Sequence, residues 1–199
     1  MKPRTLFVIG AIVLAAVSRT IPHPPNFGPI TGIALFGAAT LKDWKLALLT
    51  PLAALFVSDL LIEVLYQFGL MKSWGIYSGM WLNYSVTLGI TLFGFLLRKS
   101  SSPVRIASVT LASSCLFFGL SNFLPWAAGI ALDPEGQPYP LTAAGLLRCY
   151  TLAIPFFHWT LLGDATYVVV LFGGFALATH LLPALREPQW APAVAPAPE

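Results

Sequence analysis

The sequence predicts an all-α integral membrane protein built as a six-helix transmembrane bundle. Of its 199 residues, 57% are hydrophobic and only 10% are charged, whereas a soluble domain carries about 25% charged residues. The mean hydropathy is +0.77. Apolar runs of near-membrane length alternate with short polar segments. Length and pattern together predict one membrane domain over residues 1–185, followed by a disordered Pro/Ala-rich tail over residues 186–199.

The first expected span covers residues 6–17, after the basic residues Lys2 and Arg4. A charged start, a short apolar core and small residues also describe a cleavable signal peptide, so both interpretations remain open. The second span covers residues 29–41, which is shorter than the roughly 20 residues needed to cross a bilayer. It completes a crossing only if the segment before it occupies part of the membrane depth.

That segment, residues 21–29, contains four prolines and is predicted to be an irregular, proline-rich first loop. Proline donates no backbone hydrogen bond and pushes the residue before it out of the helical region. Irregular backbone at membrane depth is tolerated only where protein or a water-filled cavity satisfies its polar groups. The loop is therefore a candidate wall of a binding site.

Four further spans are expected, at residues 46–66, 74–97, 104–128 and 164–182. Before the last of them, residues 142–162 are half polar, contain Pro155 and end in the aromatic sequence Phe156-Phe157-His158-Trp159. Aromatic residues concentrate at the level of the lipid headgroups. This pattern predicts an interfacial or re-entrant helix before the last span.

The basic residues predict the orientation of the six spans. With the N-terminus in the cytoplasm, eight basic residues fall inside and three fall outside, which accounts for all eleven. The inside group is Lys2, Arg4, Lys42, Lys45, Arg98, Lys99, Arg105 and Arg186, and the outside group is Arg19, Lys72 and Arg148. We therefore expect both termini on the cytoplasmic side.

In this topology nearly all intramembrane polar residues fall in the outer half. Ionisable groups within spans are costly, so they line a cavity or pair with one another. The candidate ligand-binding residues are Arg19, His23, Asn26, Asp59, Asn122, Arg148 and Asp164. Structural salt bridges, Arg19 with Asp59 or Arg148 with Asp164, are the alternative interpretation of the charged members.

Other chemistry has little support in the sequence. Ala11 and Ala15 form a small-xxx-small face that permits close helix packing. No two histidines stand at the i, i+4 spacing of a helical metal site, and we expect no metal or other cofactor. No P-loop motif is present. The scattered basic residues do not indicate nucleic-acid binding.

Several sequence blocks resemble an uncharacterised family of small bacterial membrane proteins. They lie in order between residues 19 and 167, beginning with Arg19-x3-His23-Pro24-Pro25-Asn26-Phe27-x-Pro29 and Ala34-Leu35-Phe36-Gly37. Later blocks are Pro51-Leu52-Ala53-Ala54, Ser58-Asp59-Leu60, residues 117–122 and 145–150, Ile154-Pro155-Phe156-Phe157 and Thr160-Leu161-Leu162-Gly163-Asp164. The resemblance places the protein in a bacterial cytoplasmic membrane.

That family is in turn loosely similar to the substrate-binding S components of energy-coupling-factor (ECF) vitamin transporters. This resemblance implies six helices, a first loop that closes over an outward-facing site, and a small-residue face on the first helix that docks a coupling subunit. Ala11 and Ala15 match the docking face in residue type. No vitamin-specific signature is recognisable, so the resemblance names no substrate.

Three functional hypotheses follow. The first is capture and uptake of a small organic solute, vitamin-like or precursor-like, with a separate energising membrane subunit as partner. The second is an accessory or assembly subunit of a larger membrane complex. The third is a membrane enzyme acting on a lipid-linked substrate, with Asp59 and His23 or His158 as its acid/base pair. We expect the first, with the lipid bilayer and the solute as the principal partners.

Overall fold

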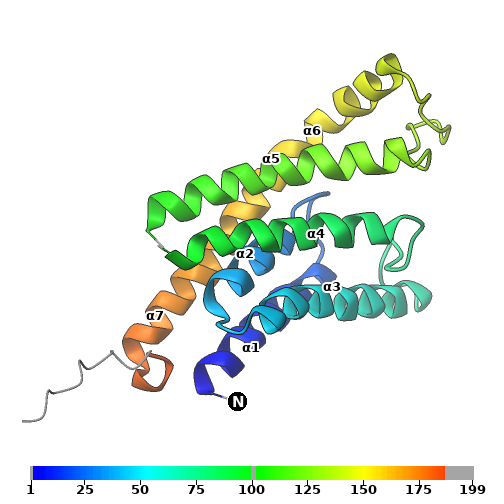
Figure 1. The fold of residues 1–199 in the computed structure, drawn as a ribbon. Helices are drawn as coiled ribbons and strands as arrows, with labels where there is room; N and C mark the ends of the chain where they lie inside the picture. Colours follow the sequence, from blue (N-terminus) through cyan, green and yellow to red (C-terminus); the bar gives the residue numbers. More distant parts are fainter. Residues whose placement is uncertain (1, 100–101, 187–199) are drawn as a thin grey trace, which may run out of the picture.

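The computed structural model describes residues 2–99 and 102–186, and this part of the chain is helical without a β-strand. Its helices are α1 (Pro3–Val17), α2 (Ile30–Thr40), α3 (Trp44–Gln67), α4 (Met80–Gly94), α5 (Pro103–Ala127), α6 (Ala143–Val168) and α7 (Gly174–Leu181). Five helical segments are long and apolar enough to cross a membrane. The predicted all-α architecture is confirmed for the described residues (Figure 1).

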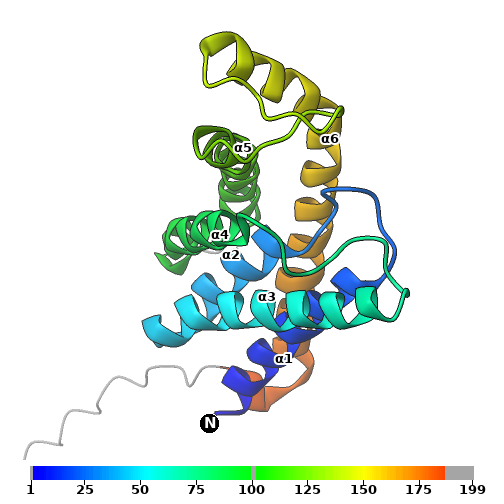
Figure 2. The ribbon, with the colours of Figure 1, turned by 90° about the vertical axis from the view of Figure 1, so that its right-hand side faces the viewer.

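The expected interfacial helix before the last span is wrong. α6 continues through a π-helical turn (Val169–Gly173) into α7, so that residues 143–181 form one rod. Pro155 lies inside α6 without ending it, as prolines do in membrane helices whose surroundings satisfy the released carbonyl groups. At 39 residues the rod is about 58 Å long, nearly twice the ~30 Å hydrocarbon core. Figure 2 shows its N-terminal part rising beyond the other helices.

The short helix α2 is the centre of the fold. Its 11 residues include eight consecutive buried ones, from Thr31 to Ala38, and it packs against α1, α3, α4, α5 and α6. Two glycines make this packing close. A Cβ on Gly32 would lie 2.9 Å from the Tyr167 Cβ, and one on Gly94 would lie 2.8 Å from the Ala38 Cβ. Small residues at these crossings let the backbones approach.

The proline-rich loop is irregular, as its sequence predicts, and its end packs inside the bundle. Residues 21–29 form no helix, and Pro29 is fully buried. The loop packs on Gly163, where a Cβ would approach the Gly28 nitrogen to 2.8 Å, and the Phe27 ring contacts the Tyr167 ring. Since Gly163 follows Ala143 by twenty residues, this contact is about 30 Å along the rod. The loop and α2 therefore share one passage through the bundle.

Candidate functional site

The predicted polar residues lie toward one end of the bundle, which we call the loop end. It is the end where loops 68–79 and 128–142 connect α3 to α4 and α5 to α6 (Figure 1). Two polar groups are found there. One is an ion-pair network that joins η1 (Ser18–Thr20), α3 and α4, and the other is a cavity between α5, α6 and the loops.

The ion-pair network is centred on Asp59. The Arg19 Nη1 lies 2.7 Å from the Asp59 Oδ1, and the Asp59 side chain is only 3% exposed. Arg19 also donates to the Ser58 hydroxyl, and the Tyr84 hydroxyl donates to the Asp59 Oδ2 over 2.6 Å. The salt-bridge interpretation of Arg19 and Asp59 is thus confirmed, and both charges are satisfied within the chain.

Loop 68–79 covers this network. The Glu63 Oε2 accepts hydrogen bonds from the backbone N–H groups of Gly75 and Ile76, at 3.0 and 3.1 Å. Gly75 lies so close to α3 that a Cβ would stand 1.9 Å from the Asp59 carbonyl oxygen. The position therefore requires glycine. From the same loop, the Tyr77 hydroxyl accepts a hydrogen bond from the Asn83 Nδ2.

The second group surrounds a cavity of about 530 Å³, which we call the site cavity. Its polar lining includes Asn26, Asn83, Ser121, Asn122 and Thr160, and its aromatic lining includes Phe117, Phe118 and Phe156. Asn26 and Asn122 are sequence-predicted site residues, and the fold brings them together from the proline-rich loop and α5. A volume of this size lies within the roughly 300–1,000 Å³ range of small-molecule pockets.

Several polar groups of the site cavity have no partner among the described residues. The Thr160 and Ser121 hydroxyls and the Asn26 amide form no hydrogen bond within that part of the chain. Other helix hydroxyls, such as those of Thr110 and Thr151, instead donate to the carbonyl one turn earlier. Thr160 is only 5% exposed, and buried polar groups are normally hydrogen-bonded. Unused hydrogen-bonding capacity is what a ligand site requires.

Asn26 has a backbone φ of 64°, the single positive value of a non-glycine residue in the described chain. Asparagine tolerates this left-handed conformation better than most residues. It lies at the rim and is exposed. His23, three residues earlier, is also exposed, and its Nδ1 contacts the Pro24 carbonyl oxygen at 2.9 Å. His23 does not line the cavity.

Loop 128–142 closes one side of the site cavity, and Arg148 holds this loop in place through ion pairs. The Arg148 Nη2 lies 3.1 Å from the Asp133 Oδ2 and 3.0 Å from the Glu135 Oε2. The Asp133 Oδ1 accepts hydrogen bonds from the backbone N–H groups of Glu135 and Gln137. The Gln137 backbone hydrogen bond and the Arg148 charge lower the Asp133 pKa below its usual value. The charge of the only acid lining this cavity in the described chain is therefore compensated.

The alternative pairing of Arg148 with Asp164 is wrong. Sixteen residues of continuous helix separate them, which is about 24 Å. Asp164 is 3% exposed, and its Oδ2 accepts a 2.6 Å hydrogen bond from the Ser114 hydroxyl. Asp164 thus lies one turn deeper than Thr160, beneath the site cavity but not on its wall.

Ala11 and Ala15 lie on the inner side of α1. Ala15 is buried and Ala11 is partly buried against the same hydrophobic cluster. Their small-residue face is therefore used within the chain, while Leu14 on the same helix is 74% exposed. A docking role for these alanines stays a prediction.

Sequence reasoning missed part of this site. Ser121 and Thr160 look like ordinary helix hydroxyls in the sequence, and Tyr84 carries no pattern that pairs it with Asp59. Neither Trp81 nor Trp126 lines the site cavity: Trp81 is 71% exposed, and Trp126 donates a hydrogen bond to the Pro140 carbonyl. Two sequence features could have indicated these residues: Ser121 is adjacent to Asn122, and Thr160 lies one helical turn before Asp164. In the described chain no cluster of three or more His, Cys, Asp or Glu residues could hold a metal ion.

Comparison with known proteins identifies a family but no function. No curated protein and no solved structure matches the chain, so these comparisons show no likeness to the S components of ECF transporters. A family described as a family of unknown function (DUF6580) matches residues 1–185. Because this match covers nearly the whole sequence, the chain belongs to the DUF6580 family.

Proposed function

We propose that this membrane protein captures a small, uncharged organic solute in the site cavity. The observation that carries the proposal is the convergence of hydrogen-bonding groups without partners in the described chain, on Asn26, Ser121 and Thr160, around a hollow of about 530 Å³. Thr160 is the buried member of this set, and an unpaired buried hydroxyl is costly unless a ligand or water satisfies it.

The lining defines the chemical class of the solute. Three phenylalanines favour a flat apolar body, and amide and hydroxyl groups favour a rim of hydrogen-bond donors and acceptors. The charge on Asp133 is compensated by Arg148, so nothing in the described lining selects a strongly charged molecule. A neutral heterocycle, vitamin-like or precursor-like, fits this description.

The direction of capture rests on charge. Eight of the eleven basic residues belong to the segments that the topology places inside, which favours a cytoplasmic location for both termini and an outer location for the loop end. The setting is then a bacterial cytoplasmic membrane. Uptake, energised by a separate membrane subunit in the manner of an S component, is the finer part of the proposal. Exposed side chains of α1 such as Leu14 would then contact that subunit.

The test is ligand retention by purified protein. Protein in lipid nanodiscs is equilibrated with a bacterial metabolite extract, washed and analysed by mass spectrometry for the retained compound. With that compound, Thr160→Val and Asn122→Ala should each weaken binding by up to about tenfold, the value of one or two lost hydrogen bonds. Thr151→Val on the same helix and Gln67→Ala are the matched controls, because neither side chain lines the site cavity.

Two results would count against the proposal. One is a retained compound whose affinity is unchanged in both cavity variants. The other is protein that retains no small molecule but copurifies with a large membrane partner, which would favour the accessory-subunit hypothesis.

A further inference from the structure

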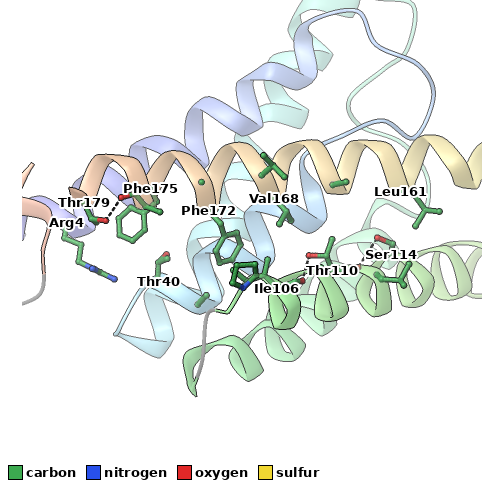
Figure 3. Close-up of a pocket in the computed structure, with 18 residues that line it drawn as sticks. Arg4, Thr40, Ile106, Thr110, Ser114, Leu161, Val168, Phe172, Phe175 and Thr179 are labelled. Carbon is green, nitrogen blue, oxygen red and sulfur yellow. Dashed lines mark hydrogen bonds between the residues drawn. The ribbon is translucent and has the colours of Figure 1, made fainter. Parts of the chain in front are cut away.

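A second hollow begins beneath the site cavity and extends toward the opposite end of the molecule. It is a groove of about 860 Å³ between α5 and the α6–α7 rod, with Ala39 and Thr40 of α2 at its base. Figure 3 shows it extending from Ser114 and Leu161 at one end to Arg4 and Thr179 at the other. Most of its lining is aliphatic or aromatic, as with Ile106, Val168 and Phe172. We call it the lateral groove.

The lateral groove opens sideways. Leu111 and Val169 line its two edges and are 57% and 69% exposed. Both belong to helical segments that are long and apolar enough to cross a membrane, so in a bilayer the opening would face hydrocarbon. Along α5 the lining extends from Pro103 to Ser114, which is about 16 Å. One leaflet of a ~30 Å hydrocarbon core is about 15 Å deep, so the groove has the depth of one layer of acyl chains.

The lateral groove leads into a basic pocket of about 840 Å³. The two hollows share Arg4, Ala39, Phe175, Ala176 and Thr179. The basic pocket adds Arg98, His180 and Arg186, and its described lining includes no carboxylate. An apolar channel therefore ends where three arginines gather.

Hydrogen bonds to neutral carbonyl groups fix two of these arginines in place. The Arg98 Nε donates to the Ala38 carbonyl over 2.9 Å and its Nη2 to the Leu41 carbonyl over 2.6 Å. The Arg186 Nε donates to the Thr179 carbonyl over 2.9 Å. These bonds hold the guanidinium groups at the mouth while preserving their net positive charge.

We propose that the lateral groove and the basic pocket together bind one anionic glycerophospholipid. An acyl chain lies in the groove, and the phosphate lies among Arg4, Arg98 and Arg186. Charge complementarity identifies this occupant, because basic pockets beside membrane helices attract anionic headgroups, whereas an apolar partner helix would gain nothing from three arginines. The site is independent of the solute cavity.

Native mass spectrometry of the purified protein tests the assignment. Phosphatidylglycerol and phosphatidylcholine with identical acyl chains are titrated separately, and glycerol phosphate is titrated as the headgroup without chains. We expect phosphatidylglycerol to bind at least tenfold more tightly than either of the others. Equal affinity for both lipids, or binding of glycerol phosphate as tight as that of phosphatidylglycerol, would overturn the proposal.

Matched variants locate the site. Ala107→Phe fills the lateral groove and should weaken phosphatidylglycerol binding at least tenfold, whereas Ala112→Phe, also exposed on α5 but outside the groove, should not. Ala165→Leu fills the groove from the opposite wall and tests the site even if Ala107→Phe does not fold. Arg186→Gln should reduce the preference for phosphatidylglycerol by about fivefold, and Arg105→Gln, which lies outside the basic pocket, should leave it intact. Unchanged binding in Ala107→Phe and Ala165→Leu would contradict the location.

Discussion

At the scale of single residues, the buried ion pair between Arg19 and Asp59 joins η1 (Ser18–Thr20), just before the proline-rich loop, to α3. Asp59 is 3% exposed, forms an ion pair with Arg19 and accepts a hydrogen bond from the Tyr84 hydroxyl. Asp59→Asn leaves the Arg19 guanidinium without its counter-charge, and removing one partner of a buried pair costs about 3–5 kcal/mol. We expect a loss of about 3 kcal/mol in the free energy of unfolding, measured by SDS titration in mixed micelles.

The double variant provides the control for that prediction. Arg19→Gln combined with Asp59→Asn removes both charges, so it should be less destabilised than the sum of the two single variants. Strict additivity would mean that the two side chains contribute separately and that the pair does not hold η1 (Ser18–Thr20) against α3.

Some residue-scale features were predictable from the sequence and others were not. Charges within apolar runs need partners, and this rule alone made Arg19 with Asp59 a candidate pair. The same rule also suggested a pair between Arg148 and Asp164. That pair is wrong because it required a helix to end between the two residues, whereas α6 is continuous there. Arg148 instead forms ion pairs with Asp133 and Glu135 of loop 128–142. No local sequence pattern indicates that this loop folds back toward α6.

At the scale of elements, one glycine determines how the proline-rich loop meets α6. A Cβ on Gly163 would lie 2.8 Å from the Gly28 nitrogen, whereas one on Gly174, in the same rod, would meet nothing within 4 Å. Gly163→Ala should therefore displace residues 27–28 and cost about 1–3 kcal/mol. Gly174→Ala should be neutral or stabilising by up to about 1 kcal/mol.

SDS titration measures both glycine variants, and ligand retention measures the effect on the site. Because Asn26 lies at the rim of the site cavity, Gly163→Ala should also weaken solute binding while Gly174→Ala should not. Equal stability of the two variants would show that the loop does not pack tightly on α6.

Loop 128–142 should respond to acid through Asp133. Its pKa is lowered in the fold, first by the Gln137 backbone hydrogen bond and also by Arg148. A lowered pKa means that the carboxylate stabilises the loop above its usual pKa of about 3.8 and that this contribution is lost as the pH falls through the lower folded value. Pepsin should therefore cut this loop faster at pH 2 than at pH 4.5, relative to a reference peptide.

Two variants isolate the acid effect. Asp133→Asn should be cut at similar relative rates at both pH values, because the group that titrates has been removed. Glu135→Gln should retain most of the difference between the two pH values, since the Asp133 hydrogen bonds to the loop backbone remain. A wild-type loop cut equally at both pH values would contradict the role of Asp133.

The elements themselves were largely predictable, because length and hydropathy identify membrane helices directly. The span expected at residues 46–66 corresponds to α3 (Trp44–Gln67), and the irregular loop before α2 follows from its prolines. The failure at residues 142–182 has a physical cause. An internal proline ends most helices in water, but α6 continues through Pro155. Gly163, just before Asp164, forms no turn and instead lets the proline-rich loop pack against α6.

At the scale of the whole molecule, the chain crosses the membrane six times if α2 and the proline-rich loop together make one crossing. Both termini then lie on the same side. α2 alone is about 16 Å long, half of the hydrocarbon core, and the loop packs beside it on the middle of the α6–α7 rod. The alternative is a re-entrant α2 that returns to its starting side. The two possibilities place the N-terminus on opposite sides of the membrane while leaving the later loops unchanged. The basic pocket, which Arg4 lines together with Ala39 and Arg98, favours the complete passage.

Cysteine labelling in intact cells distinguishes these two arrangements. In a Cys115→Ser, Cys149→Ser background, Lys2→Cys should be labelled by a membrane-impermeant maleimide only after permeabilisation, as should Lys45→Cys. Lys72→Cys and Glu135→Cys should be labelled without it, because their loops are at the opposite end of the bundle (Figure 1). Labelling of Lys2→Cys in intact cells together with protection of Lys45→Cys would show that α2 does not complete a passage. Since the positive-inside count depends on that passage, such a result would also remove Lys2 and Arg4 from the inner group and weaken the case that the site cavity opens outward.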